Sequence, residues 1–309
     1  MPQADRARTS QASRRSALVD LAARSGGWSY YADRSSRIEP TCWALLALGP
    51  AGADPREAAA LTGARTFLRG LQRPDGLLVE PATPGPNYGW NGLALLALND
   101  RDSLDLVDRL AGGLLAAKGI RIEPDAPGAS AVRVDSRLQA WSWTEGTFSW
   151  VEPTAYCMLA LKARRVAGPA VEARLAEAEA VLLDRVCEPG GWNYGNAQVL
   201  AQDLRPYVPT TALALLALQD KSHHPVVERS LDWLAAHALA ERSSMALSLA
   251  AMALHVYGRP EDAVLRELAA QQERSRALGN AHLQAMALYA LTLSAHQATA
   301  LRVASPRPS

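Results

Sequence analysis

In this 309-residue chain, two glutamates and one histidine occur at the same distance along the sequence before short Ala/Leu-rich segments. Glu39, Glu152 and His282 each lie five residues before such a segment. Two facing carboxylates can divide the roles of acid and base, and a neighbouring histidine can exchange a proton with either. These three residues are therefore the candidate catalytic residues.

Aromatic residues gather near the same places. Trp43 and Tyr156 follow Glu39 and Glu152 by four residues, so in helices they would lie one turn deeper on the same faces. Aromatic walls of this kind suit polyprenyl chains, carbocations or sugar rings. The candidate ligand-binding residues are Trp43, Tyr88, Trp90, Trp141, Trp143, Trp150, Tyr156, Tyr194 and Tyr207.

A purely structural interpretation of these residues is also open. Glu39 and Glu152 could cap helices, His282 could be a satisfied polar residue, and half of the aromatics could be plain packing. A carboxylate at a helix N-terminus is stabilised by the helix dipole, which lowers its pKa and argues against a strong general acid.

The elements that must position these residues form a repeat. Six segments are apolar on nearly every face, as expected for helices buried all round; they are 44–48, 94–98, 157–161, 214–218, 250–254 and 287–291. Amphipathic segments, several opening with proline, alternate with them; they are 16–24, 55–71, 103–118, 169–187, 225–239 and 260–273. The pattern predicts an all-α (α/α)6 toroid of six inner and six outer helices over 16–295, between disordered tails at 1–15 and 296–309. An open helical solenoid is the alternative.

The turns before the inner segments carry a family resemblance. Gly26-Gly27-Trp28 and Gly190-Gly191-Trp192 each lead through a short polar loop to Pro-Thr and an Ala/Leu segment, and the run from Trp141 to Trp150 leads to Pro153-Thr154. From 26 to 293 the chain resembles the prenyltransferase/squalene-cyclase repeat family. The resemblance implies a toroid that binds an isoprenoid or other apolar small molecule in its central cavity, with a cyclase- or transferase-like activity. Trp28 and Trp192 are interpreted as residues that seal the repeats.

The family's chemical motifs do not carry over. The chain has neither an Asp-x-Asp-Asp acid cluster nor an Asp-Asp-x-x-Asp magnesium motif, and Pro209-Thr210-Thr211 replaces the family's Asp and Cys zinc ligands. We therefore expect no metal and no cofactor. Two other functions stay open: a non-catalytic binding or scaffold toroid, and a carbohydrate-active α/α barrel using Glu39 and Glu152.

Composition limits the partners. Hydrophobic residues make up 49% of the chain, enough for a large core, while the net charge of +1 and the lack of a basic stripe argue against nucleic acid. Apolar runs of about ten residues are too short to cross a bilayer, so we expect a cytoplasmic protein without stable membrane insertion. The three cysteines suggest no disulfide framework, and Cys42 and Cys157, each in an Ala/Leu run, are expected to be reduced core thiols. The resemblance leaves room for a helical partner subunit.

Overall fold

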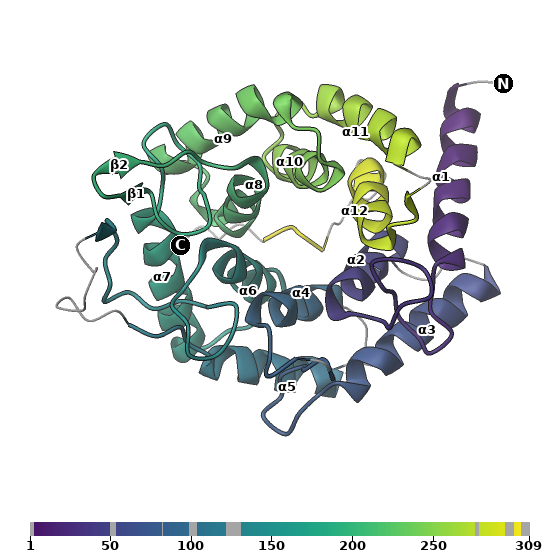
Figure 1. Cartoon of the computed structure of the whole chain (residues 1–309), viewed down its shortest axis with the longest axis horizontal. Helices are drawn as coiled ribbons and strands as arrows, with labels where there is room; N and C mark the ends of the chain where they lie inside the picture. Colours follow the sequence, from purple (N-terminus) through teal and green to yellow (C-terminus); the bar gives the residue numbers. More distant parts are fainter. Residues whose placement is uncertain are drawn as a thin grey trace.

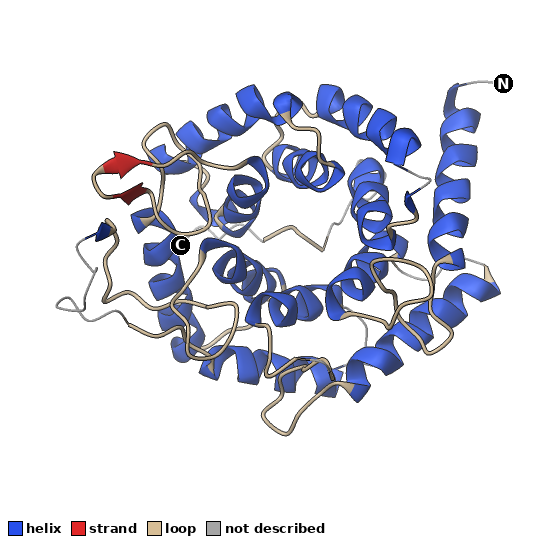
Figure 2. Cartoon of the chain, in the orientation of Figure 1, coloured by secondary structure: helices blue, strands red, loops and turns tan. Residues whose placement is uncertain are grey.

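Twelve α-helices alternate between an inner and an outer ring in the computed structural model, which describes residues 3–49, 54–81, 83–98, 104–121, 131–275, 278–293 and 300–303 (Figures 1 and 2). The inner helices are α2 (Ile38–Leu48), α4 (Tyr88–Ala97), α6 (Val151–Ala163), α8 (Val208–Ala217), α10 (Ser244–Val256) and α12 (Ala281–Thr292). The outer helices are α1 (Gln3–Asp20), α3 (Pro55–Gly70), α5 (Leu104–Ala116), α7 (Pro169–Asp184), α9 (Pro225–His237) and α11 (Asp262–Ser275). Short 3-10 helices η3 (Gln219–Lys221) and η4 (Ala238–Ala240) and an antiparallel hairpin of β1 (Gln198–Val199) and β2 (Gln202–Asp203) complete the described elements.

The inner ring closes on itself. Each inner helix packs against the next, and α12, the last of them, packs against α2, the first. This contact confirms the predicted (α/α)6 toroid, because an open solenoid would leave α2 and α12 apart. Since inner and outer helices alternate, all six inner helices begin at the same end of the ring, seen towards the viewer in Figure 1.

The inner helices are buried all round, as the Ala/Leu segments predict. Every residue of α2 is buried. Small residues bring α4 and α6 together: a Cβ placed on Gly92 would lie 2.7 Å from the backbone nitrogen of Cys157. Cys42, Cys157 and Cys187 are free, buried thiols, and Cys42 and Cys157 belong to the main hydrophobic core, as predicted.

One set of hydrogen bonds seals three of the repeats. The Trp28 indole donates to the carbonyl of Leu18 at the end of α1 (2.8 Å), while the Thr41 hydroxyl bonds the Trp28 backbone in both directions (2.9 and 3.1 Å). The same pattern joins Trp141 to Leu114 and Thr154, and Trp192 to Leu182 and Thr211. Trp28 and Trp192 are therefore the sealing residues that the sequence predicts.

Glycine before the sealing tryptophan is required by this arrangement. Gly27 and Gly191 have φ of 76° and 80°, in the left-handed region that side chains rarely adopt. A Cβ on either would also lie within 2.8 Å of the hydroxyl oxygen of Thr41 or Thr211, the group that bonds the tryptophan. Any larger residue would displace the threonine.

The first outer helix differs from its prediction. We expect a helix at 16–24 after a disordered tail, but α1 runs from Gln3 to Asp20. The segment before Ser16 contains alanine, arginine and glutamine, which favour helix, and lacks glycine and proline beyond residue 2.

The C-terminal tail prediction also needs correction within residues 300–303. Leu301 is 1% exposed and belongs to the main hydrophobic core, with Ala300 and Val303 packed against it. Residues 294–299 and 304–309 lie outside the described residues.

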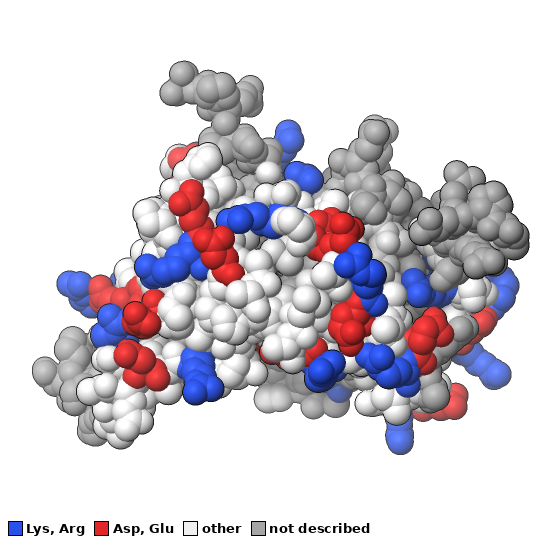
Figure 3. All heavy atoms as spheres, turned by 90° about the horizontal axis from the view of Figure 1, so that it is seen from above, with Lys and Arg blue, Asp and Glu red and all other residues white. Residues whose placement is uncertain are grey.

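Charged side chains of both signs are interspersed on the face of the molecule drawn in Figure 3. Some charged side chains form ion pairs, such as Arg259, in the loop before α11, with Asp232 of α9 at 2.8 Å. Within the described part of the chain, no helix has the length and apolar character needed to cross a membrane.

Candidate functional site at the N-terminal ends of the inner helices

Glu39 and His282 meet where the ring closes. Both lie in the first turn of an inner helix, α2 and α12, and Nε2 of His282 is 3.2 Å from Oε1 of Glu39. Tyr30, in the loop before α2, donates its hydroxyl to the other oxygen of Glu39, and its ring meets the His282 imidazole edge-on at 5.6 Å between centroids. The backbone carbonyl of Tyr30 also accepts a hydrogen bond from the backbone N–H of Ala281 (3.0 Å). If each outer helix and the inner helix that follows it are called a unit, this bond ties the first unit (α1 and α2) to the sixth and last (α11 and α12).

The polar groups of this cluster are at least partly buried, and they differ in whether they form a hydrogen bond: Tyr30 and Glu39 do, and His282 Nε2 does not. Burial, and then the charge of Glu39, raise the pKa of Tyr30, so its hydroxyl keeps its proton for Glu39. His282 Nε2 is close enough to Glu39 for an ion pair but is not aligned for a hydrogen bond. His282 Nε2 is therefore available to a further partner.

Glu39 does not cap its helix, contrary to the structural interpretation. Glu80, in the loop after α3, accepts from the backbone N–H of Ile38 (2.7 Å) and from the guanidinium of Arg37 (2.8 Å). That buried carboxylate serves the start of α2, where Arg37 provides no side-chain cap. No sequence pattern identifies Glu80 as the residue that caps α2, because Glu80 belongs to the following unit.

Glu152 has a sparser environment. It lies in the first turn of α6 and is partly buried, and the hydroxyl of Thr210, in α8, donates a hydrogen bond to its Oε1 across 3.3 Å. Burial raises the pKa of Glu152 from 4.5 to about 7; the hydrogen bond from Thr210 opposes the shift, and the charge of Glu39 adds to it. The predicted lowering of this pKa by the helix dipole is therefore wrong, because desolvation exceeds it.

Trp43 and Tyr156 lie on the inner face of the ring. Trp43 belongs to α2 and Tyr156 to α6, and α4 separates these two helices in the ring. Even so, the Trp43 indole is close enough to lower the pKa of the Tyr156 hydroxyl, which burial and then the charges of Glu39 and Glu152 raise. Side chains from helices that are not neighbours can meet in this way only inside the ring. The Trp43 N–H is not aligned for a hydrogen bond with any protein group and is left without a partner.

Further aromatics extend this wall. The Trp90 ring lies 6.0 Å from Tyr156 and 5.1 Å from Trp143, between centroids. Tyr289 of α12 lies 6.2 Å from Trp43 on the other side. Tyr289 was missed by sequence reasoning, although it follows His282 by seven residues, two helical turns, and so shares its face.

Tyr194 and Tyr207 stand at the rim beside Glu152. They precede α8 and are 50% and 46% exposed, with ring centroids 5.2 Å apart. The charge of Glu152 contributes to raising the pKa of Tyr194, after burial, which places the two groups near each other. An exposed tyrosine pair next to a carboxyl group is accessible to a ligand at this end of the ring.

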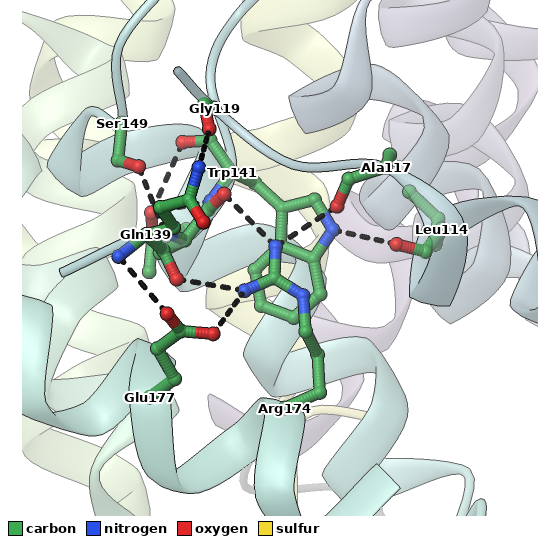
Figure 4. Close-up of polar contacts among 10 residues, drawn as sticks. Leu114, Ala117, Gly119, Gln139, Trp141, Ser149, Arg174 and Glu177 are labelled. Atoms are coloured by element: carbon green, nitrogen blue, oxygen red, sulfur yellow. Dashed lines mark hydrogen bonds and ion pairs between the residues drawn. The ribbon is translucent and has the colours of Figure 1, made fainter. Parts of the chain in front are cut away.

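Trp141 is not part of the wall. It is fully buried between the layers, where the Arg174 guanidinium stacks 4.0 Å from its ring centre (Figure 4). Arg174 in turn donates to the carbonyls of Ala117, Gln139 and Ala140. The structure thus assigns Trp141 a sealing role, which its equivalence to Trp28 and Trp192 could have indicated.

Two other predicted ligand residues have mainly local contacts. Trp150 stacks on Phe148 with centroids 4.9 Å apart. Tyr88 begins α4, is buried, and bonds its backbone N–H to the carbonyl of Trp143 (2.9 Å). Of the nine predicted residues, Trp43, Trp90, Trp143 and Tyr156 are brought together as one wall, with Tyr194 and Tyr207 at the rim.

Metal binding finds no support in the described residues. No group of three or more His, Cys, Asp or Glu side chains in those ranges could hold an ion. The chemistry available at this end is that of two carboxyl groups, one imidazole and tyrosine hydroxyls.

Comparisons with known proteins address the fold. No protein-family model matches the chain, and no curated protein matches its sequence. Among solved structures, a protein from Actinoplanes is 19% identical, with a TM-score of 0.60 over 93% of this chain and 99% of that one. A variant of the type II terpene cyclase MstE from Scytonema, in complex with geranylgeranyl dihydroxybenzoate, is 14% identical, with a TM-score of 0.57 over 95% and 98%. An α-amylase from Clostridium perfringens is 11% identical, with a TM-score of 0.59 over 90% and 97%. These likenesses place the chain among the α/α toroids and establish its fold alone.

Proposed function

We propose that the toroid binds an isoprenoid or similar apolar ligand along its axis, with the polar end of the ligand between Glu39 and Glu152. The observation that carries the proposal is the meeting of Trp43 and Tyr156 inside the ring, one turn below the two carboxyl groups. Aromatic faces favour hydrocarbon chains and positive charge. The structurally similar terpene cyclase, bound to geranylgeranyl dihydroxybenzoate, adds support at the level of fold.

Unpartnered polar atoms support a ligand with a polar end. The Trp43 N–H and His282 Nε2 are buried without a hydrogen-bond partner, and both lie beside Glu39 or one turn below it. A hydroxyl or carbonyl group on the ligand would satisfy the indole donor. Glu152, with a pKa of about 7, offers a proton to such a ligand near neutral pH.

The test is native mass spectrometry of the protein from its own host, followed by lipid extraction. We expect a co-purifying polyprenyl or triterpene species, lost in Trp43→Ala. Trp233→Ala is the matched control, because Trp233 lies on the outer helix α9 and stacks on His237. An empty wild-type protein that also fails to bind farnesol or squalene would refute the proposal and favour a scaffold, for which a helical partner subunit remains a prediction.

A carbohydrate-active barrel is the second candidate, favoured by a different observation. Glu152 is an acid with a raised pKa beside the exposed Tyr194–Tyr207 pair, and stacked tyrosines suit sugar rings. The structurally similar α-amylase supports this second candidate at the level of the fold. Release of reducing sugar from a panel of polysaccharides, abolished in Glu152→Gln, would support it. Absence of hydrolysis across the panel would reject it.

A further inference from the structure

We infer that residues 300–303 form a strap that closes the end of the ring opposite Glu39 and Glu152. In Figure 1 this short yellow segment crosses the middle of the ring behind the inner helices. The inference concerns access to the ring and does not depend on which ligand the ring binds.

The strap is held by one side chain at the far end of the ring. Gln219 begins the 3-10 helix η3, separated by one residue from the end of α8, so it lies at the C-terminal end of the inner helices. Its amide nitrogen donates to the carbonyl of Leu301 (2.7 Å), and its amide oxygen accepts from the N–H of Val303 (3.1 Å). A side-chain amide that bonds a backbone on both sides fixes the position and direction of that backbone.

A buried leucine anchors the strap. Leu301 is 1% exposed and belongs to the same core cluster as the inner helices. The side chain of Gln219 is fixed in this orientation by a further hydrogen bond, from its amide nitrogen to the carbonyl of Leu216 in α8 (2.6 Å). A surface tail without a role would not need a buried leucine and a preset amide.

The position of the strap sets the depth of the ring. Gln219 follows Thr210 by nine residues, so about 13 Å along the helix axis separate Gln219 from the layer of Thr210 and Glu152. With the far end closed, a ligand enters and leaves past the two carboxyl groups and extends no deeper than the strap. The reacting or polar end of a long ligand is then held at the carboxyl layer.

Hydrogen exchange of the full-length protein tests the strap without any ligand. We expect the Val303 amide to be protected in the wild type and to exchange at least about tenfold faster in Gln219→Ala, because one clamp bond is worth about 1 kcal/mol or more and the variant removes two. Leu301→Asp should remove the protection fully, while Leu301→Met keeps it. An unprotected Val303 amide in the wild type would overturn the inference.

Entry kinetics provide the second readout, with N-phenyl-1-naphthylamine as an apolar fluorescent probe. Leu301→Asp should raise the association and dissociation rates of the probe severalfold and leave its Kd nearly unchanged, since it opens a second route to the same site. Equal rates in Leu301→Asp and Leu301→Met, with Val303 protection lost in the first, would show that the strap closes nothing. Failure of the wild type to bind the probe would count against the proposed function and leave the exchange result to decide the strap.

Discussion

Glu39 and Glu152 occupy equivalent positions, in the first turn of inner helices two units apart, and yet have different surroundings. Glu39 receives the Tyr30 hydroxyl and faces the His282 imidazole. Glu152 receives one long bond from Thr210 and has a pKa near 7. The position in the first turn of a helix therefore does not by itself set the pKa of a carboxyl group here; at Glu152 burial outweighs it, and the hydrogen bond from Thr210 only opposes the rise.

The difference follows from the residues that adjoin each glutamate. Glu39 adjoins the last unit, which brings His282, while the loop before α2 in its own unit brings Tyr30. Unit three meets α8, whose start, Val208-Pro209-Thr210, offers one hydroxyl. Ring closure thus gives Glu39 two close polar partners, whereas Glu152 has one long hydrogen bond and a raised pKa.

The largest expected effect concerns the pH dependence of Glu152. Its folded-state pKa of about 7 lies above 4.5, so its stabilising contribution is complete below about pH 4.5 and is lost as the pH rises to about 7. The wild type should therefore lose up to about 3 kcal/mol of unfolding free energy across this window relative to Glu152→Gln, less whatever solvent screening removes. Urea denaturation of both proteins from pH 4 to 8 measures the difference. Parallel curves would contradict the raised pKa.

At pH 8, Glu39→Gln should lower the free energy of unfolding, in contrast to Glu152→Gln. It weakens the hydrogen bond that Tyr30 donates to the buried carboxylate, for a loss of about 2 kcal/mol. Glu152→Gln at the same pH should be neutral or stabilising, because it removes a buried negative charge. Equal losses in the two variants would erase the proposed difference between the two carboxyl groups.

Tyr30→Phe should cost about 1 kcal/mol, the worth of one hydrogen bond to a buried carboxylate. The ring contact with His282 is kept, so the loss reports the hydroxyl. Tyr31→Phe is the control, because Tyr31 is 54% exposed. If the two variants unfold alike, Tyr30 does not hold Glu39.

Thr210→Val should have the smallest effect on stability, and it tests how far a hydrogen-bond donor lowers the pKa of Glu152. Its hydroxyl stabilises the charged form, so its removal should raise the pKa of Glu152 further, by a fraction of a unit for so long a bond. The midpoint of the pH-dependent loss of stability moves upward accordingly. A downward shift would show that Thr210 does not donate to this carboxyl group.

The ring and most of the carboxyl layer could be predicted from the sequence. Ala/Leu segments buried on every side require a second layer, and a shared offset from each segment brings Glu39 and His282 together once the ring closes. The sealing role of Trp28 and Trp192 follows from the repeated Gly-Gly-Trp turn.

The environment of each site residue could not be predicted in the same way. Glu80 and Thr210 reach their partners from other units, and no local pattern marks them. The pKa of Glu152 depends on how much water the fold removes, which the helix dipole argument ignored. Gln219 and Leu301 are 82 residues apart, beyond the range of any periodicity in the chain.

Carboxyl carbon NMR of protein labelled at glutamate, recorded from pH 3 to 9, tests the central claim most directly. The claim predicts one glutamate resonance that titrates near pH 7, is absent in Glu152→Gln, and moves to lower pH in Glu39→Gln, because the charge of Glu39 helps to raise it. A Glu152 resonance that titrates near pH 4.5 would contradict the division of the two carboxyl groups into a bonded carboxylate and a neutral acid.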